Sequence, residues 1–132
     1  NLLSRKDPEG NVTSYTYTAD FNKLKSTTDP LGNVTENQYD TNGNKTGTTN
    51  PLNNSTQNEY NQYGEVIRNV NAEGAETRYE YDTYGYQIKI IDANGNETQK
   101  EYDTVGRFIK ITSTINNQLS TTLTMSWIML PK

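Results

Sequence analysis

Residues 71–91 read NAEGAETRYEYDTYGYQIKII, and this stretch decides the fold of the chain. From residue 75 to residue 81 the side chains alternate, so that Thr77, Tyr79 and Tyr81 face one way and charged residues face the other. A period of two residues is typical of a β-strand. The flanking NAEG and DTYG are turn sequences, and Gly85 is expected to take a positive φ. The stretch therefore predicts a unit of turn, strand, turn and return strand.

The same unit recurs every 21 residues. Each repeat begins with a turn, and its first strand ends in a tyrosine, an Asp or Asn and, three residues later, a glycine. The repeat-defining residues are Tyr39, Asp40, Gly43, Tyr60, Gly64, Tyr81, Asp82, Gly85, Tyr102, Asp103 and Gly106. A fixed period of this kind is the signature of a repeat protein.

The period predicts how the chain is organised. Residues 1–6 are expected to be an N-terminal leader, and residues 7–112 five repeats of about 21 residues, the first of them degraded. Residues 113–132 break the pattern, with both methionines, the only tryptophan and no acidic residue. They are predicted to be an atypical tail or capping strands, because terminal repeats differ from internal ones. A frameshifted tail is the alternative.

The return strands predict two unlike faces. Ile67, Ile88 and Ile109 share one repeat position, and Ile90 and Ile111 lie two residues further on the same face. The opposite face carries Arg68, Lys89 and Lys110 with Glu59, Glu80 and Glu101. The fold class is therefore all-β: antiparallel hairpin repeats forming a curled meander sheet of about ten strands, about 48 Å wide. Unit 29–49 has Asn44, Thr46 and Thr48 on the apolar face, and Thr46 and Thr48 stand where later units have isoleucine, so the units before residue 50 should fray first.

The composition excludes several classes of protein. Only 30% of the 132 residues are hydrophobic, which is too few for the core of a compact enzyme. The chain has no histidine or cysteine, so no catalytic, cofactor or metal site is expected. A net charge of −4 argues against a nucleic-acid partner. The longest apolar run, residues 127–130, is far too short to span a membrane.

Three series of repeated residues can be interpreted either as ligand sites or as structural features. The series Asp40, Asp82 and Asp103 fits a calcium ladder, but Asp is also a turn-forming residue, and each turn offers one carboxylate. The repeat tyrosines fit stacking on sugar rings, but they share a face with Thr and Ile, which favours packing. The Arg68, Lys89 and Lys110 stripe fits an anionic polymer, but the interleaved acids favour a neutralised, solvated face.

The motifs YDTNG at 39–43, YDTYG at 81–85 and YDTVG at 102–106, with the preceding DPLGN and DANGN turns, resemble the YD repeats of Rhs proteins. Related repeats occur in bacterial wall-associated proteins, toxin complexes and teneurins. The resemblance covers residues 7–112. It implies a β-sheet strip that spirals into a shell around a toxin or serves as a cell-surface scaffold. Five units are too few to close a shell, and the self-cleaving segment of that family is not recognisable here.

The sequence predicts a non-enzymatic structural segment of an exported bacterial Rhs-like protein, secreted or on the cell surface. Its partners would be neighbouring repeats of a longer chain, or other copies joined through the sheet edges. An adhesive module that binds a glycan or a protein is one alternative, and a self-assembling filament subunit is another. The face on which the tyrosines lie should discriminate between scaffold and adhesin.

Overall fold

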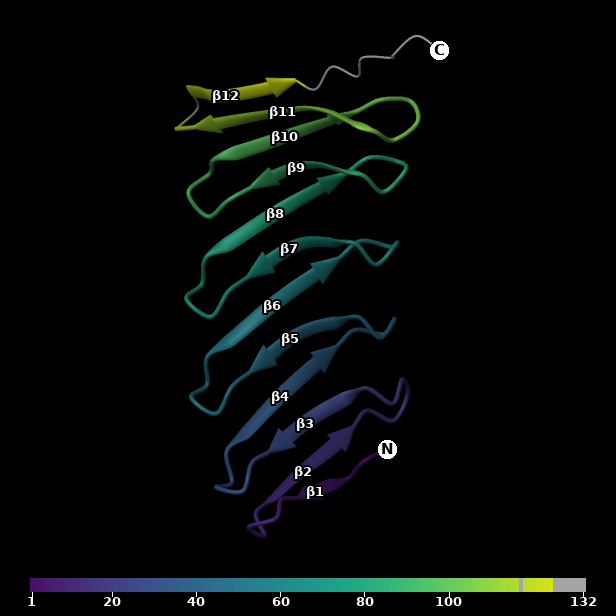
Figure 1. Ribbon diagram of the computed structural model, residues 1–132, viewed down its shortest axis with the longest axis vertical. Coiled ribbons are helices and arrows are strands. Elements are labelled where there is room, and N and C mark those ends of the chain that lie inside the picture. The colour runs from purple at the N-terminus through teal and green to yellow at the C-terminus, as the bar shows by residue number, and fades with distance from the viewer. Residues whose placement is uncertain (117, 125–132) are drawn as a thin grey trace.

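The computed structural model describes residues 1–116 and 118–124, and these form twelve β-strands and no helix (Figure 1). The strands follow one another in a single sheet, each antiparallel to its neighbours in sequence. They are β1 (Ser4–Lys6), β2 (Val12–Tyr17), β3 (Leu24–Thr28), β4 (Val34–Tyr39), β5 (Lys45–Thr49), β6 (Ser55–Tyr60), β7 (Val66–Val70), β8 (Glu76–Tyr81), β9 (Gln87–Ile91), β10 (Glu97–Tyr102), β11 (Phe108–Ile115) and β12 (Gln118–Thr124). The predicted all-β meander of antiparallel hairpins is confirmed.

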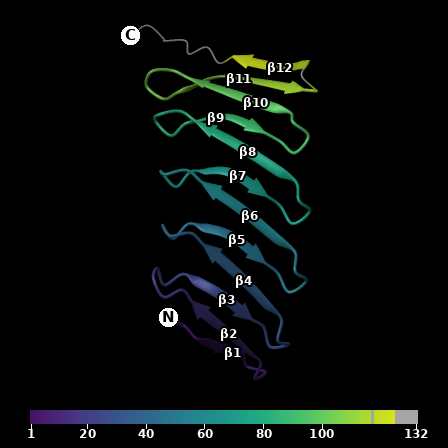
Figure 2. The same ribbon diagram turned by 180° about the vertical axis from the view of Figure 1, so that it is seen from behind.

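The sheet is an open, twisted strip one layer thick. Figures 1 and 2 show β1 and β12 at its two ends, and within the described residues no segment packs against either face. No hydrophobic side chain in the described part of the chain is fully buried. The strip is therefore held together by strand pairing, by turns and by contacts between neighbouring strands, since it has no core between layers.

The four hairpins from β4 to β11 close with the same short turn. In the turn after β8, the Gly85 amide donates to the Asp82 carbonyl at 3.1 Å, and the Asp82 amide donates to the Tyr86 carbonyl at 2.9 Å. This is a three-residue hairpin loop that ends in a left-handed residue. The φ of Gly85 is +84°, which confirms the positive φ expected from the sequence. Asn53 takes the glycine's place in one turn, with φ +62°, as an Asn can.

A β-bulge follows the same period. The register shifts at each repeat tyrosine, so that Tyr81 pairs with Gln87 while Glu80 pairs with Lys89. Ile88 is the extra residue, and Ile67 and Ile109 occupy the same place in their own hairpins. A bulge bends its strand and increases the local twist. Neighbouring hairpins consequently pair over only three residues, as Arg68 to Val70 of β7 do with β8.

The register confirms the two predicted faces. Ile90 of β9 lies between Tyr79 and Thr98 of the adjacent strands, and we call this side the Tyr face. Lys89 lies between Glu80 and Gln99 on the other side, which we call the charged face. Side chains of the Tyr face are half-buried by their neighbours, although nothing in the described chain covers them.

The ends of the strip add strands to the ten expected from five repeats, which are β2 to β11. β1 falls inside residues 1–6, where a leader was expected, and β12 falls inside residues 113–132. β11 runs on to Ile115, which pairs with Gln118, and Asn116 has φ +51° in the tight connection. The division into leader, repeats and tail stays a prediction, and residues 125–132 lie outside the described part of the chain.

Candidate functional site

The tyrosines that define the repeat bind each unit to the one before it. In every unit the tyrosine hydroxyl donates to the backbone carbonyl of the residue 15 positions earlier, at the start of the preceding return strand. The pairs are Tyr17 with Leu2 (2.8 Å), Tyr39 with Leu24 (2.8 Å), Tyr60 with Lys45 (2.7 Å), Tyr81 with Val66 (2.9 Å) and Tyr102 with Gln87 (3.1 Å). Only three residues of each return strand pair with the next hairpin, and this carbonyl lies on the turn side of them. The tyrosine hydroxyl therefore links the two hairpins where the backbone ladder between them has ended.

Removing one of these hydroxyls should destabilise the strip. We expect Tyr81→Phe to lower the free energy of unfolding by about 1 kcal/mol, because the Val66 carbonyl loses its donor. Tyr79→Phe is the matched control: Tyr79 lies on the same strand and face, and in the described chain its hydroxyl has no hydrogen-bond partner. Urea denaturation measures both variants. Equal midpoints would show that the hydroxyl bond contributes nothing.

The turn aspartates bind their own loops. Asp40 Oδ1 accepts the amides of Asn42 and Asn44, both at 2.9 Å, and Oδ2 accepts the Asn44 side-chain amide at 2.9 Å. That side-chain bond is the main cause that holds the pKa of the carboxyl below its ordinary value. At Asp7, Asp29 and Asp92, an asparagine four residues later likewise lowers the pKa of the aspartate carboxyl. The carboxylates thus organise the turns, which supports the turn-forming interpretation over a calcium ladder.

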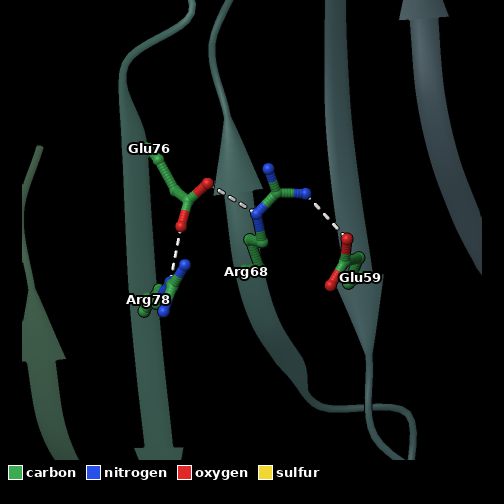
Figure 3. A network of polar contacts seen from close by, with 4 residues as sticks. All are labelled: Glu59, Arg68, Glu76 and Arg78. Carbon is green, nitrogen blue, oxygen red and sulfur yellow. Dashed lines mark hydrogen bonds and ion pairs between the residues drawn. The ribbon is translucent and has the colours of Figure 1, made fainter.

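The charged face is a chain of ion pairs from β6 to β8 (Figure 3). Arg68 contacts Glu59 through Nη1 and Glu76 through Nε, both at 2.7 Å, and Glu76 also contacts Arg78. The bond from Arg68 is the main cause that lowers the pKa of Glu76. Further along, Lys89 pairs with Glu97 at 2.8 Å and Lys110 with Glu101 at 2.6 Å. The predicted neutralisation of the basic stripe is confirmed.

A cleft opens at the edge of the strip formed by the turns Asp40–Gly43, Asn61–Gly64, Asp82–Gly85 and Asp103–Gly106, which we call the YD edge. It lies between the last two of these turns and has a volume of about 970 Å³. Its walls include three tyrosine rings: Tyr86 stacks on Tyr102 at 5.0 Å, and Tyr84 is tilted against Tyr86 at 6.5 Å. This cleft is the candidate ligand site of the molecule.

Metal-binding clusters and membrane-spanning helices are both absent from the described residues. No group of three or more acidic residues is arranged to hold a metal ion within this part of the chain. Among the described residues, no helix is long and apolar enough to cross a membrane.

Comparison with known proteins identifies the repeat. Residues 20–55 match the family model of the RHS Repeat. The predicted resemblance is confirmed, and the match spans the end of the degraded first unit and the whole of unit 29–49. No curated protein matches the chain.

Several solved structures share this fold. The crystal structure of TcdB2-TccC3 aligns with a TM-score of 0.70 at 22% identity, over 88% of this chain and 6% of that one. A form without the hypervariable C-terminal region gives 0.69 at 22% identity, with the same coverage. A Photorhabdus luminescens Tc holotoxin pore gives 0.66 at 22% identity, over 86% and 6% of the two chains. At these identities the likeness shows the fold, and this chain spans a small fraction of the length of each.

The repeat units place the predicted residues in two groups. The repeat tyrosines lie on the Tyr face, half-buried, and the Asp and Gly residues build the YD edge. The cleft residues Tyr84 and Tyr86 were not singled out by the sequence. They flank Gly85 at variable repeat positions: among the units from residue 29 on, only Tyr63 matches Tyr84 and no tyrosine matches Tyr86, so the period carries little signal for them.

Proposed function

We propose that this chain is a structural segment of an exported bacterial Rhs-like protein, a piece of a surface scaffold or toxin shell with no catalysis of its own. The tyrosine bond from each unit to the carbonyl of the unit before it carries the proposal. A sheet that grows by such bonds extends with each added unit and has no natural end. Its unpaired edges, β1 and β12, then adjoin neighbouring repeats of a longer chain or other copies.

The composition of the two faces supports the same function. The basic stripe of the charged face, Arg68, Lys89 and Lys110, is neutralised by ion pairs, and the repeat tyrosines use their hydroxyls within the sheet. In the described chain, neither of these two series is therefore a row of free groups for chemistry. One of the similar solved structures is a Tc holotoxin pore, and this supports a secreted or cell-surface location for the present chain.

Duplicating one unit tests the structural role. A second copy of residues 71–91 inserted after Ile91 should add one hairpin, lengthen the particle by about 10 Å and raise the urea midpoint. Small-angle scattering and denaturation measure the two effects. The control is a 21-residue Gly/Ser insert at the same position, which should interrupt the sheet. A duplicated chain that unfolds as readily as the control would contradict an extensible strip.

Glycan adhesion remains the second candidate, and one observation favours it. The repeat tyrosines are committed within the sheet, but Tyr63 and Tyr84 in the turns of the YD edge are 77% and 85% exposed. Open aromatic rings of this kind can stack on sugars. A glycan array with the wild-type chain and a Tyr63→Ala, Tyr84→Ala double variant tests the idea. Binding that is lost in the double variant supports it, and the absence of any hit removes it.

A further inference from the structure

The cleft of the YD edge contains an aspartate, Asp82, whose hydrogen bonds differ from those of the other turn aspartates. Asp82 Oδ1 accepts the amides of Tyr84 and Tyr86, both at 2.9 Å, as in every turn of this type. In the other aspartate turns of this form, Oδ2 is bound by the residue four positions on, either an Asn or Arg107. Tyr86, at that position, makes no side-chain bond to Asp82, and its ring stacks on Tyr102 instead. Within the described residues, Asp82 Oδ2 therefore has no protein partner.

A second carboxylate of the same cleft is also without an ion pair. Glu80 lies opposite Lys89 in the register, but the Lys89 ammonium contacts Glu97 at 2.8 Å instead. The other charged groups of the cleft are engaged: Glu101 with Lys110, Asp103 with Arg107, and Lys100 with the Gln87 side-chain oxygen at 2.7 Å. In the described chain, the cleft thus keeps two carboxylates, Glu80 and Asp82, that no cation contacts directly, although the charge of Lys89 acts on Glu80 and Lys100 keeps its positive charge.

The aromatic walls complete the chemistry. Tyr84 is 85% exposed, and its ring meets that of Tyr86 at an angle of 41°. The face of a tyrosine ring carries negative potential and attracts a cation, and arginine is the commonest protein cation in such contacts. A planar guanidinium can stack on the ring while its N–H groups donate to a carboxylate. An exposed ring beside an unpaired carboxylate is complementary to that group in both charge and shape.

We propose that this cleft binds an arginine side chain of a partner polypeptide, with the guanidinium stacked on Tyr84 and hydrogen-bonded to Asp82. Glu80 adds negative charge at the same wall. The preceding turn provides an internal comparison: Tyr63 is exposed to nearly the same degree, but Asn61 replaces the aspartate and its side-chain amide donates to Glu65 at 2.6 Å. That turn has the ring, but one oxygen of its carboxylate, Glu65, is already bound by Asn61, so we expect it to bind the guanidinium more weakly.

The test uses the full chain and a short probe peptide, acetyl-Gly-Arg-Gly-amide. Backbone amide shifts at residues 82–86 in a ¹H–¹⁵N NMR titration should saturate at millimolar peptide. The same peptide with citrulline, a neutral isostere of arginine, should bind at least about fivefold more weakly, because the charge-assisted bond is lost. Added salt should weaken binding of the arginine peptide but not binding of the citrulline peptide.

Three variants separate the proposed contacts. Asp82→Asn should weaken binding about tenfold yet keep the turn, since Asn61 and Asn71 accept the same backbone bonds in this sheet. Tyr84→Leu should weaken it about threefold by removing the ring. Tyr63→Leu is the matched control and should change nothing.

Several outcomes would overturn the proposal. One is that the citrulline peptide binds as tightly as the arginine peptide. Another is that Tyr63→Leu and Tyr84→Leu lower the affinity equally. A third is that 20 mM arginine peptide shifts no amide signal. Equal losses at the two tyrosines together with glycan binding would assign the edge to sugar stacking instead. None of these results bears on the extensible strip, which the duplicated unit tests separately.

Discussion

Gly106→Ala is expected to destabilise the strip far more than Gly95→Ala, although both glycines have φ +80°. The backbone penalty for a Cβ at positive φ is about 1–2 kcal/mol and applies to both variants. The surroundings differ. A Cβ on Gly95 meets nothing within 4 Å, whereas a Cβ on Gly106 would collide with the ring and hydroxyl of Tyr86. Because Tyr86 stacks on Tyr102, it cannot yield freely.

We therefore expect Gly95→Ala to cost about 1 kcal/mol and Gly106→Ala about 3 kcal/mol, read from urea midpoints at constant m value. The Tyr86→Ala background is the control, since without the tyrosine ring the two glycine variants should cost the same. Equal costs in the wild-type background would show that successive turns of the YD edge are not packed on one another.

The second large effect is a gradient of amide exchange along the strip. On the Tyr face, Thr48 lies between Asn37 and Thr56, whereas its counterpart two units later, Ile90, lies between Tyr79 and Thr98. The ion pairs of the described chain, moreover, all lie between residues 59 and 110. Cross-strand pairs contribute roughly 0.2–1 kcal/mol each, so two or three better pairs per hairpin make a tenfold difference in opening.

Hydrogen exchange should accordingly be at least about tenfold faster for amides of β2 to β5 than for those of β8 to β11. Thr48→Ile, which gives β5 the residue found in β9, should slow exchange in β4 to β6 and leave β10 unchanged. Uniform protection along the strip would mean that it unfolds as one cooperative unit, and the expected fraying before residue 50 would be wrong.

Much of this fold follows from the sequence, because its signals are local. Alternation over residues 75–81 places a strand and its two faces, and the Asp and Gly of the DTYG turn specify a left-handed residue at Gly85. Repetition at 21 residues then makes every neighbour in sequence a neighbour in the sheet. The meander, the Tyr face and the charged face are direct consequences of that short-range chemistry.

Only the tertiary structure determined the features that depend on how far adjacent strands are offset from one another. That Ile88 is a bulged residue, that Tyr81 reaches the Val66 carbonyl, and that Tyr86 covers Gly106 all depend on how adjacent hairpins are offset and twisted. The free oxygen of Asp82 also depends on the structure, because it follows from which side chain reaches back across its turn. Spacing along the chain determines which residues share a face, but only the three-dimensional offset of the hairpins determines which atoms meet.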